Sequence, residues 1–173
     1  VGRVGNDDFG DTLIQGLVED KVKTTHVIKD SDAPTGIAMI AVAADGENLI
    51  VVAAGANLEG SAEDVNNARS LMRETDILLL QLEVPLETVG AAVDLAVAYE
   101  VPVVLNPAPA QTLSKALLAN VDVLTPNRSE LAMLTEEEDL DKGIKKLREW
   151  GVKNLVVTLG ANGARVVTDD IDQ

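Results

Sequence analysis

Five polar side chains follow apolar runs of the sequence, at the points where buried strands are expected to end. They are Glu83, Asn106, Asn127, Glu130 and Thr158. In open α/β sheets, ligands bind where the carboxyl ends of neighbouring parallel strands meet. Carboxylates, amides and a hydroxyl at such an edge can hydrogen-bond a small polar substrate, and a carboxylate can hold a hard cation. Their placement after successive runs therefore predicts a binding site.

Each position also has a purely structural interpretation. Asn127 and Glu130 form an Asn-x-x-Glu capping box, which alone is more typical of a helix start than of a ligand contact. Asn106 precedes Pro107, and a residue before proline favours a turn. Glu83 can simply be solvated. Glu83 and Glu130 as the two acids of a glycoside hydrolase are a weaker alternative, because nothing in the sequence fixes their separation.

The fourth strand end is rich in glycine, with the sequence Thr158-Leu159-Gly160-Ala161-Asn162-Gly163. Two glycines at this spacing match neither the dinucleotide-binding fingerprint nor the P-loop, and alone they predict only a tight turn. A parallel sheet with such an end nevertheless suits a nucleotide better than the substrate of a hydrolase.

The strands that end in these residues alternate with helical patterns. Strands are expected at Ile77–Leu80, Val101–Leu105, Val121–Leu124 and Asn154–Thr158. Helices are expected at Asp8–Glu19, from Ser61 to about Met72, from Pro85 to about Tyr99, and at about Thr112–Leu118, Arg128–Leu134 and Leu140–Trp150. Pro85 suits a first helical position, and Ser61 with Asp64 forms a second capping box. Because the strands are continuously apolar, an α/β fold is predicted, with a parallel sheet covered by helices on both faces.

Residues 35–54 have a different pattern. Two apolar runs, Gly36–Val42 and Leu49–Val52, flank Asp45-Gly46-Glu47-Asn48. An Asp-Gly pair between two such runs is typical of a β-hairpin turn. A small hairpin is therefore predicted as an addition to the parallel sheet.

The composition excludes several functions. The net charge of -15 disfavours a nucleic acid as partner, because binding its backbone requires clustered Lys and Arg. This acidity fits a well-solvated surface or a salt-rich habitat. The absence of Cys and the single histidine, His26, rule out disulfides, thiolate metal sites and a His-rich zinc cluster. No apolar run is long enough to cross a membrane and no signal peptide is visible, so a cytoplasmic protein is predicted.

Seven segments together resemble the ribokinases of the PfkB carbohydrate kinase family in order and spacing. They are Gly2–Gly10, Thr35–Ala38, Gly55–Asn57, Gln81–Glu87, Asn106–Pro109, Thr125–Glu130 and Thr158–Gly163. Gln-Leu-Glu at 81–83 and Asn-Pro-Ala-Pro at 106–109 favour a ribokinase over fructokinase or adenosine kinase relatives. The resemblance extends over essentially the whole chain, and it implies a three-layer ribokinase-like fold with a small hairpin lid at about 35–54, incomplete in this chain.

This resemblance implies ATP-dependent phosphorylation of the 5-hydroxyl of D-ribose, with Mg²⁺ and a monovalent cation such as K⁺. Glu83 is similar to the carboxylate that hydrogen-bonds the sugar hydroxyls, Asn127 to the asparagine near the ATP phosphates, and Glu130 to the acid that holds Mg²⁺ through water. The loop that runs beside the nucleotide corresponds to Thr158, Gly160, Ala161, Asn162 and Gly163. There, missing side chains let the backbone approach the ligand.

The same resemblance implies that the lid covers the sugar, with Ala38 and Ile40 lining the pocket, and that it pairs with its counterpart in a homodimer. The family's Asn-x-Asp, Gly-Gly-Lys-Gly-Ala-Asn and Asp-Thr-x-Gly-Ala-Gly-Asp segments, the last of which ends in the catalytic base, have no match in this sequence. We therefore expect a domain cut at both ends, without a catalytic residue and inactive alone. The alternatives are a kinase of this family for another sugar, and a non-catalytic binding or dimerisation module.

Overall fold

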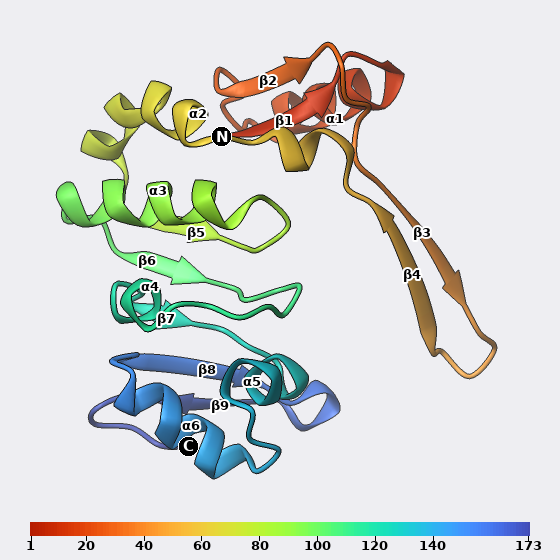
Figure 1. The fold of residues 1–173 in the computed structure, drawn as a ribbon. Coiled ribbons are helices and arrows are strands. Elements are labelled where there is room, and N and C mark those ends of the chain that lie inside the picture. Colours follow the sequence, from red (N-terminus) through yellow and green to blue (C-terminus); the bar gives the residue numbers. More distant parts are fainter. The chain divides into compact units, whose positions relative to one another are not determined.

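A computed structural model describes the whole chain, residues 1–173. The chain folds into two compact units (Figure 1). The first unit comprises Val1–Ala68 and Glu83–Thr88, and the second comprises Arg69–Leu82 and Val89–Gln173. The first unit holds two two-stranded sheets, and the second holds one five-stranded sheet.

In the first unit, a helix connects two parallel strands. β1 (Gly2–Gly5) pairs with β2 (Val27–Asp30), and α1 (Asp8–Glu19) lies between them in the sequence. Asp7 caps α1, because its Oδ1 accepts a hydrogen bond from Gly10 N at 2.9 Å. The predicted bounds of this helix are confirmed. Its apolar side chains Phe9 and Leu13 are exposed, since a two-stranded sheet is too narrow to cover them.

A cluster of charged side chains joins the parts of the first unit. Arg3 on β1 donates to both carboxylate oxygens of Asp64, at 2.8 and 2.9 Å. Arg3 also donates to Asp30 at the end of β2, at 2.8 Å. Asp64 in turn accepts from Ser61 N at 3.0 Å, which completes the predicted capping box of α2 (Ala62–Asn67). The cluster thus connects both strands with the start of a helix.

The helix expected from Ser61 to about Met72 is shorter than predicted. It ends at Asn67, and the chain continues as the 3-10 helix η2 (Arg69–Glu74). Asn66 and Asn67 explain the end, because asparagine side chains compete for backbone hydrogen bonds and weaken a helix. The 3-10 helix η1 (Gly55–Glu59) precedes α2.

The predicted hairpin is confirmed. β3 (Ile37–Val42) and β4 (Asn48–Ala53) pair antiparallel, with Ile40 opposite Ile50. Gly46 in the turn adopts a φ of 90°, which glycine accepts without steric cost. Asp45 accepts a hydrogen bond from Glu47 N at 3.1 Å and so helps to close the turn. Every residue of both strands is exposed.

The second unit is built on a mostly parallel sheet. Its strands are β5 (Leu78–Leu80), β6 (Val103–Leu105), β7 (Val123–Leu124), β8 (Asn154–Thr158) and β9 (Ala164–Val167), in that spatial order. Neighbours from β5 to β8 are parallel, and β9 pairs antiparallel with β8 at one edge. The four predicted strands are therefore confirmed, with β5, β6 and β7 each shorter than expected.

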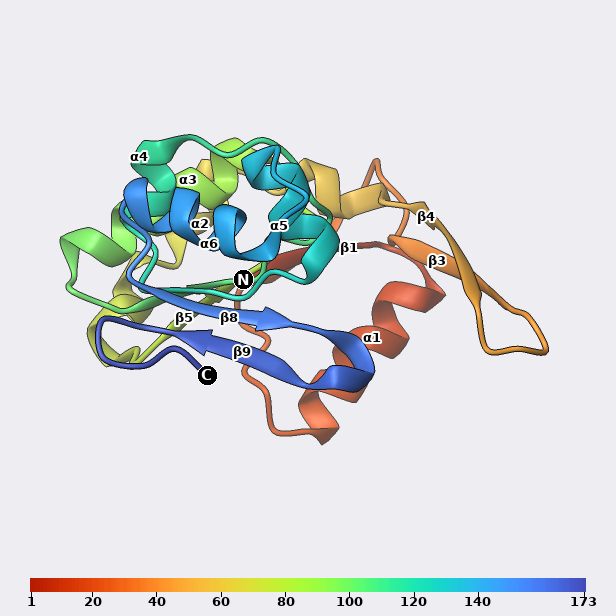
Figure 2. The same cartoon turned by 90° about the horizontal axis from the view of Figure 1, so that it is seen from below.

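The helices of the second unit gather on one face of this sheet (Figure 2). They are α3 (Leu86–Ala98, which belongs to this unit from Val89 onward), α4 (Lys115–Ala119), α5 (Arg128–Thr135) and α6 (Leu140–Glu149). Leu155 and Val157 of β8 are fully buried, whereas Leu79 of β5 is 73% exposed and the neighbouring Ile77 is 53% exposed. The prediction of a fully buried first strand is therefore wrong, whereas the predicted α/β class with a mostly parallel sheet and helices is confirmed. No helix has the length and apolar composition needed to cross a membrane.

Candidate functional site

The residues that follow β6, β7 and β8 lie along one edge of the sheet. Asn106 N donates to Leu80 O and Thr158 N donates to Pro126 O, both at 2.9 Å. Asn127, three positions after β7, forms a parallel bridge with Thr158, the last residue of β8. Hydrogen bonds between neighbouring chains thus continue past the strand ends and hold Asn106, Asn127 and Thr158 at a common edge, as predicted.

Asn127 and Glu130 are bound to each other by three hydrogen bonds. Asn127 Oδ1 accepts from Glu130 N at 2.8 Å. Glu130 Oε2 accepts from Asn127 N at 2.7 Å, and Glu130 Oε1 accepts from Asn127 Nδ2 at 2.9 Å. This arrangement confirms the structural interpretation of the pair as the capping box of α5. It also holds both side chains in fixed positions at the edge of the sheet.

The loop after β8 contains the 3-10 helix η3 (Gly160–Asn162). Gly160 and Gly163 have φ values of 60° and 83°. Gly163 N donates to Gly160 O at 3.1 Å, and Leu159 N donates to Gly163 O at 2.8 Å. A Cβ atom on either glycine would meet no atom within 4 Å. The glycines are therefore required here by the backbone conformation, and the outer side of the loop is open.

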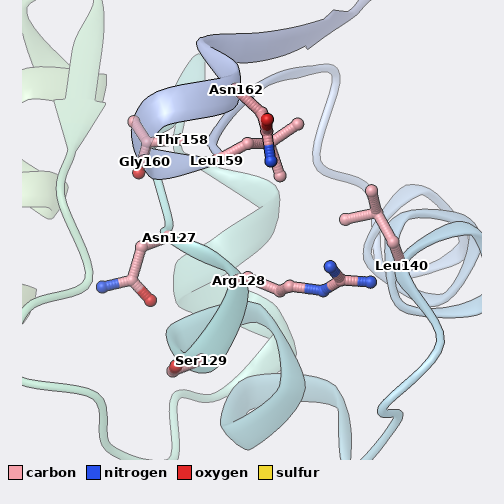
Figure 3. A pocket seen from close by; sticks show the side chains of 8 residues that line it. All are labelled: Asn127, Arg128, Ser129, Leu140, Thr158, Leu159, Gly160 and Asn162. Carbon is pink, nitrogen blue, oxygen red and sulfur yellow. The ribbon is translucent and has the colours of Figure 1, made fainter.

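A hollow of about 280 Å³ lies between this loop and the start of α5 (Figure 3). It is lined by Asn127, Arg128, Ser129, Leu140, Thr158, Leu159, Gly160 and Asn162. The lining includes four of the six residues predicted to contact a nucleotide; the other two, Ala161 and Gly163, belong to the loop but not to the lining. Figure 3 shows the side chains of Asn127 and Arg128 pointing in opposite directions, with Arg128 directed toward Leu140.

Sequence reasoning missed three residues of this lining, Arg128, Ser129 and Leu140, whereas Leu159 lies within the predicted loop Thr158–Gly163. Arg128 and Ser129 follow the cap residue Asn127 directly, so the capping box could have indicated them. Leu140 comes from α6, and no local pattern connects it with this loop. Arg128 is the one charged residue of the lining, and it lies in the first turn of α5, where the helix dipole is positive. Charge and donors together make the hollow suitable for an anionic ligand.

The residues present allow only a limited metal site. No group of three or more His, Cys, Asp or Glu side chains is arranged to hold a metal ion. Glu130 offers one carboxylate, and each of its oxygens already accepts one hydrogen bond. Because Mg²⁺ keeps several waters and often takes one or two carboxylates together with substrate phosphates, a single water-bridged carboxylate fits this ion.

The residues predicted to contact a sugar belong to the first unit. Ala38 and Ile40 lie on β3, and they point to the same face of the hairpin because side chains alternate along a strand. Glu83 begins the segment Glu83–Thr88 and follows the last residue of β5 by three positions. The structure brings together Asn106, Asn127 and Thr158; the position of Glu83 beside them stays a prediction.

Known proteins resemble this chain over nearly all of its length. A ribokinase of Haemophilus influenzae is 39% identical over 168 residues, which is 94% of this chain and 55% of the relative. A deoxyribokinase of Salmonella typhi is 34% identical over 97% of this chain and 57% of its own length. The solved structure of Arabidopsis thaliana ribokinase with ribose and ATP is 29% identical, has a TM-score of 0.88, and is matched over 100% of this chain and 59% of that protein.

The chain thus spans a little more than half the length of these relatives. The TM-score of 0.88 shows that the whole chain shares the fold of the corresponding part of the Arabidopsis structure. The sequence profile of the pfkB family carbohydrate kinases matches residues 1–172. The chain therefore belongs to the pfkB family of carbohydrate kinases.

Proposed function

We propose that the intact protein is an ATP-dependent sugar kinase of ribokinase type, which transfers the γ-phosphate of ATP to the 5-hydroxyl of D-ribose. The observation that supports this most directly is the common edge of the second unit's sheet, where Asn127, Thr158 and Gly160 line one hollow. In open α/β sheets this edge is the place where ligands bind. The similarity to ribokinases over nearly the whole chain supports the same reaction.

On the nucleotide side, the hollow offers hydrogen-bond donors and one positive charge. The amides of Asn127 and Asn162 and the hydroxyl of Thr158 can donate to phosphate or ribose oxygens. Ala161 and Gly163 act through the shape of the loop, whose open outer side leaves backbone groups accessible. Phosphoryl transfer depends mainly on positioning and charge stabilisation, so these groups hold ATP in place rather than exchange protons with it.

Glu130 is the proposed Mg²⁺ residue. Its carboxylate oxygens keep further lone pairs beyond those used by Asn127, so Glu130 can hold a water of the Mg²⁺ shell without breaking the cap. Bound Mg²⁺ would supply charge stabilisation at the phosphates. A monovalent cation such as K⁺ belongs to the proposal through the family resemblance alone.

On the sugar side, Glu83 is the proposed hydrogen-bonding partner of the sugar hydroxyls, and Ala38 and Ile40 are proposed to cover the sugar. Side chains alternate between the two faces of the hairpin along β3 and β4, which supports a lid that contacts a partner on each face. One face carries Ala38, Ile40, Val42, Asn48, Ile50 and Val52, and the other carries Ile37, Met39, Ala41, Leu49, Val51 and Ala53. Both faces are exposed, and Asn48 is the one polar residue on them. Such a hairpin needs two covering surfaces, which a sugar site and a second copy of the lid in a homodimer would provide.

The catalytic base is not assigned to any residue between 1 and 173. No segment of the chain matches the Asp-Thr-x-Gly-Ala-Gly-Asp sequence that supplies this base in the family. We therefore propose that residues 1–173 alone do not turn over ribose and ATP. A related sugar is the second candidate substrate, because the deoxyribokinase relative matches the chain at the same level of identity as several ribokinases.

A coupled kinase assay on the intact gene product tests the proposal. Ribose, 2-deoxyribose, fructose and adenosine are compared at equal concentration with Mg-ATP, and the position of the phosphate is read by NMR. We expect ribose 5-phosphate as the main product. Preference for 2-deoxyribose would support the second candidate, and no turnover of any sugar would contradict both.

Glu83→Ala in the intact protein tests the sugar assignment separately. Removing a charged hydrogen-bond partner should raise the KM for ribose by about tenfold or more, because such a bond contributes about 1.5–3 kcal/mol. The KM for ATP should change by less than about twofold. Equal changes in both constants would count against Glu83 as a sugar ligand.

A further inference from the structure

A second polar cluster in the first unit lies at the base of the hairpin. Thr35 Oγ1 donates to Asp7 Oδ1 at 2.6 Å and accepts from Gly5 N at 2.9 Å. Thr35 N donates to the other carboxylate oxygen, Asp7 Oδ2, at 2.8 Å. Thr35 is 5% exposed. Asp7 is therefore bound to Thr35 through both carboxylate oxygens, next to the point where the chain enters β3.

The same carboxylate also caps α1. Asp7 Oδ1 accepts from Gly10 N at 2.9 Å, in addition to the Thr35 hydroxyl. These hydrogen bonds lower the pKa of Asp7 below the usual carboxyl value, with the Thr35 hydroxyl as the largest cause. Asp7 is therefore ionised at neutral pH. One charged side chain thus connects the end of β1, the start of α1 and the base of the hairpin.

The two chain segments at the base of the hairpin approach each other closely. Ala56 N donates to Pro34 O at 2.8 Å, just outside the two strands. A Cβ atom on Gly36 would lie 2.6 Å from Ala54 O, and one on Gly55 would meet Pro34 O at a still shorter distance. Gly55 also has a φ of 52°. The base therefore has no room for added side chains and is a rigid crossing.

Beyond this base, the hairpin is unsupported. Every residue of β3 and β4 is exposed, so packing along the strands does not fix the direction in which the hairpin extends. Its direction is set at its base, where Asp7 is the one charged anchor of Thr35.

We propose that Asp7 is a positioning residue for the hairpin lid, because through Thr35 it orients Ala38 and Ile40 toward the sugar. The same hydrogen bonds fix the base of the lid relative to the end of β1 and the start of α1. This inference rests on the proposed function, because it takes the hairpin to be the cover of the sugar site. Asp7 itself does not contact the sugar.

Thr35→Val and Thr35→Ser in the intact protein test this proposal. Valine keeps the shape of threonine but removes the hydroxyl that links Gly5 N to Asp7, and serine keeps that hydroxyl. We expect Thr35→Val to raise the KM for ribose by about tenfold and to leave the KM for ATP within about twofold. Thr35→Ser should leave the KM for ribose within about twofold of the wild-type value.

Asp7→Asn provides a second variant in which the cap of α1 survives, since asparagine is as good an N-cap as aspartate. Its amide cannot replace both carboxylate oxygens toward Thr35, so this variant should also raise the KM for ribose selectively. Thr88→Val is the matched control. Thr88 Oγ1 donates to Gly60 O at 2.7 Å in the same unit, and both residues lie outside residues 34–57.

The hydrogen bonds of Thr35 to Asp7 and Gly5 are called the clamp below. Amide hydrogen exchange of the ligand-free proteins tests this clamp independently of the kinase activity. Peptides that cover residues 34–57 should exchange faster in Thr35→Val than in wild type and in Thr88→Val. Unchanged exchange would overturn the clamp. Faster exchange with an unchanged KM for ribose, or equal changes for ribose and ATP, would overturn the positioning role. A wild-type protein without ribose turnover would overturn the proposed function and, with it, the sugar-positioning role, whereas the exchange result would still decide the clamp.

Discussion

The two units of this chain are stabilised in different ways. The second unit contains most of the buried apolar side chains, among them Leu105, Leu124 and Leu155, which are fully buried between one sheet and its helices. In the first unit the buried side chains are only Val4, Ala56, Val65 and Ala68, together with the polar Thr35 and Asp64. Its parts are joined by hydrogen-bonded carboxylates and by close backbone contacts at glycine. The lesson is that a hairpin with fully exposed strands can be anchored by a few polar groups without a core of its own.

Deleting core volume should give the largest effect and should separate the two units most clearly. Leu155→Ala in β8 should lower the free energy of unfolding by about 3–4 kcal/mol, because it leaves a cavity at a fully buried site. Ile50→Ala in β4 removes a similar side chain that is 52% exposed and should cost less than about 0.5 kcal/mol.

Urea unfolding followed by Trp150 fluorescence measures both variants. Trp150 is the single tryptophan, and its ring centre lies 5.0 Å from Lys115 Nζ and 5.7 Å from Lys146 Nζ, so it reports on the second unit. Circular dichroism covers the whole protein. A similar loss of stability in the two variants would show that the hairpin is covered in solution, and the contrast between the units would then not extend to it.

Two glycines with similar positive φ angles provide a second test of the difference between the two units. Gly55 at the base of the hairpin has a φ of 52°, and Gly160 beside the hollow has a φ of 60°. Alanine at Gly160 meets open space, so only the backbone penalty of about 1–2 kcal/mol applies. Alanine at Gly55 also collides with Pro34 O and should cost about 3 kcal/mol or more. Thermal unfolding of both variants checks this order, and equal losses would show that close packing at the base of the hairpin does not matter.

Asp64 tests whether charge replaces a core in the first unit. Arg3 lowers the pKa of Asp64 by hydrogen bonding, so the folded state prefers the ionised carboxylate. This stability is fully present above the ordinary carboxyl pKa of about 3.9 and is lost as the pH falls toward the lower folded value. Asp64→Asn should cost about 2 kcal/mol at pH 7 and progressively less at lower pH.

Urea titrations at pH 7 and at about pH 3 measure the difference between Asp64→Asn and wild type. Asp11→Asn is the control, because Asp11 forms an exposed ion pair with Lys29 and such pairs contribute little. A cost for Asp64→Asn that does not depend on pH would show that its charge is not the stabilising feature.

Local patterns predicted the elements of both units, and long-range contacts escaped them. The Asp45-Gly46 turn and the caps at Ser61 and Asn127 involve neighbours in the sequence, so these features were predicted correctly. The bond between Arg3 and Asp64 joins residues 61 positions apart, and no pattern in the sequence pairs them.

The same limit explains the errors at the sheet and at the site. Continuous apolar runs such as Ile77–Leu80 indicated a strand but could not show which face this chain covers, and Leu79 is in fact exposed. The common edge of Asn106, Asn127 and Thr158 followed from strand order alone, because parallel neighbours bring their carboxyl ends together. Leu140 was missed because the turn before α6 returns it to the hollow, which depends on how two helices pack.

Glu130 should give the smallest effect on stability and a large one on function, which sets it apart from the residues above. Glu130→Gln keeps a side chain that can still complete a capping box, so it should cost less than about 0.5 kcal/mol. If Glu130 holds Mg²⁺ through water, loss of its charge should raise the Mg²⁺ concentration needed for half-maximal kinase activity of the intact protein by about tenfold.

Asp122→Asn is the matched control for the loss of one negative charge. Asp122 accepts a hydrogen bond from Val103 N at 2.8 Å, at the amino ends of the strands, and asparagine can keep this bond. Its Mg²⁺ requirement should stay at the wild-type value. An unchanged requirement in Glu130→Gln would leave this residue with the helix cap as its one role, and the contrast between a stabilising first-unit carboxylate and a functional second-unit carboxylate would fail.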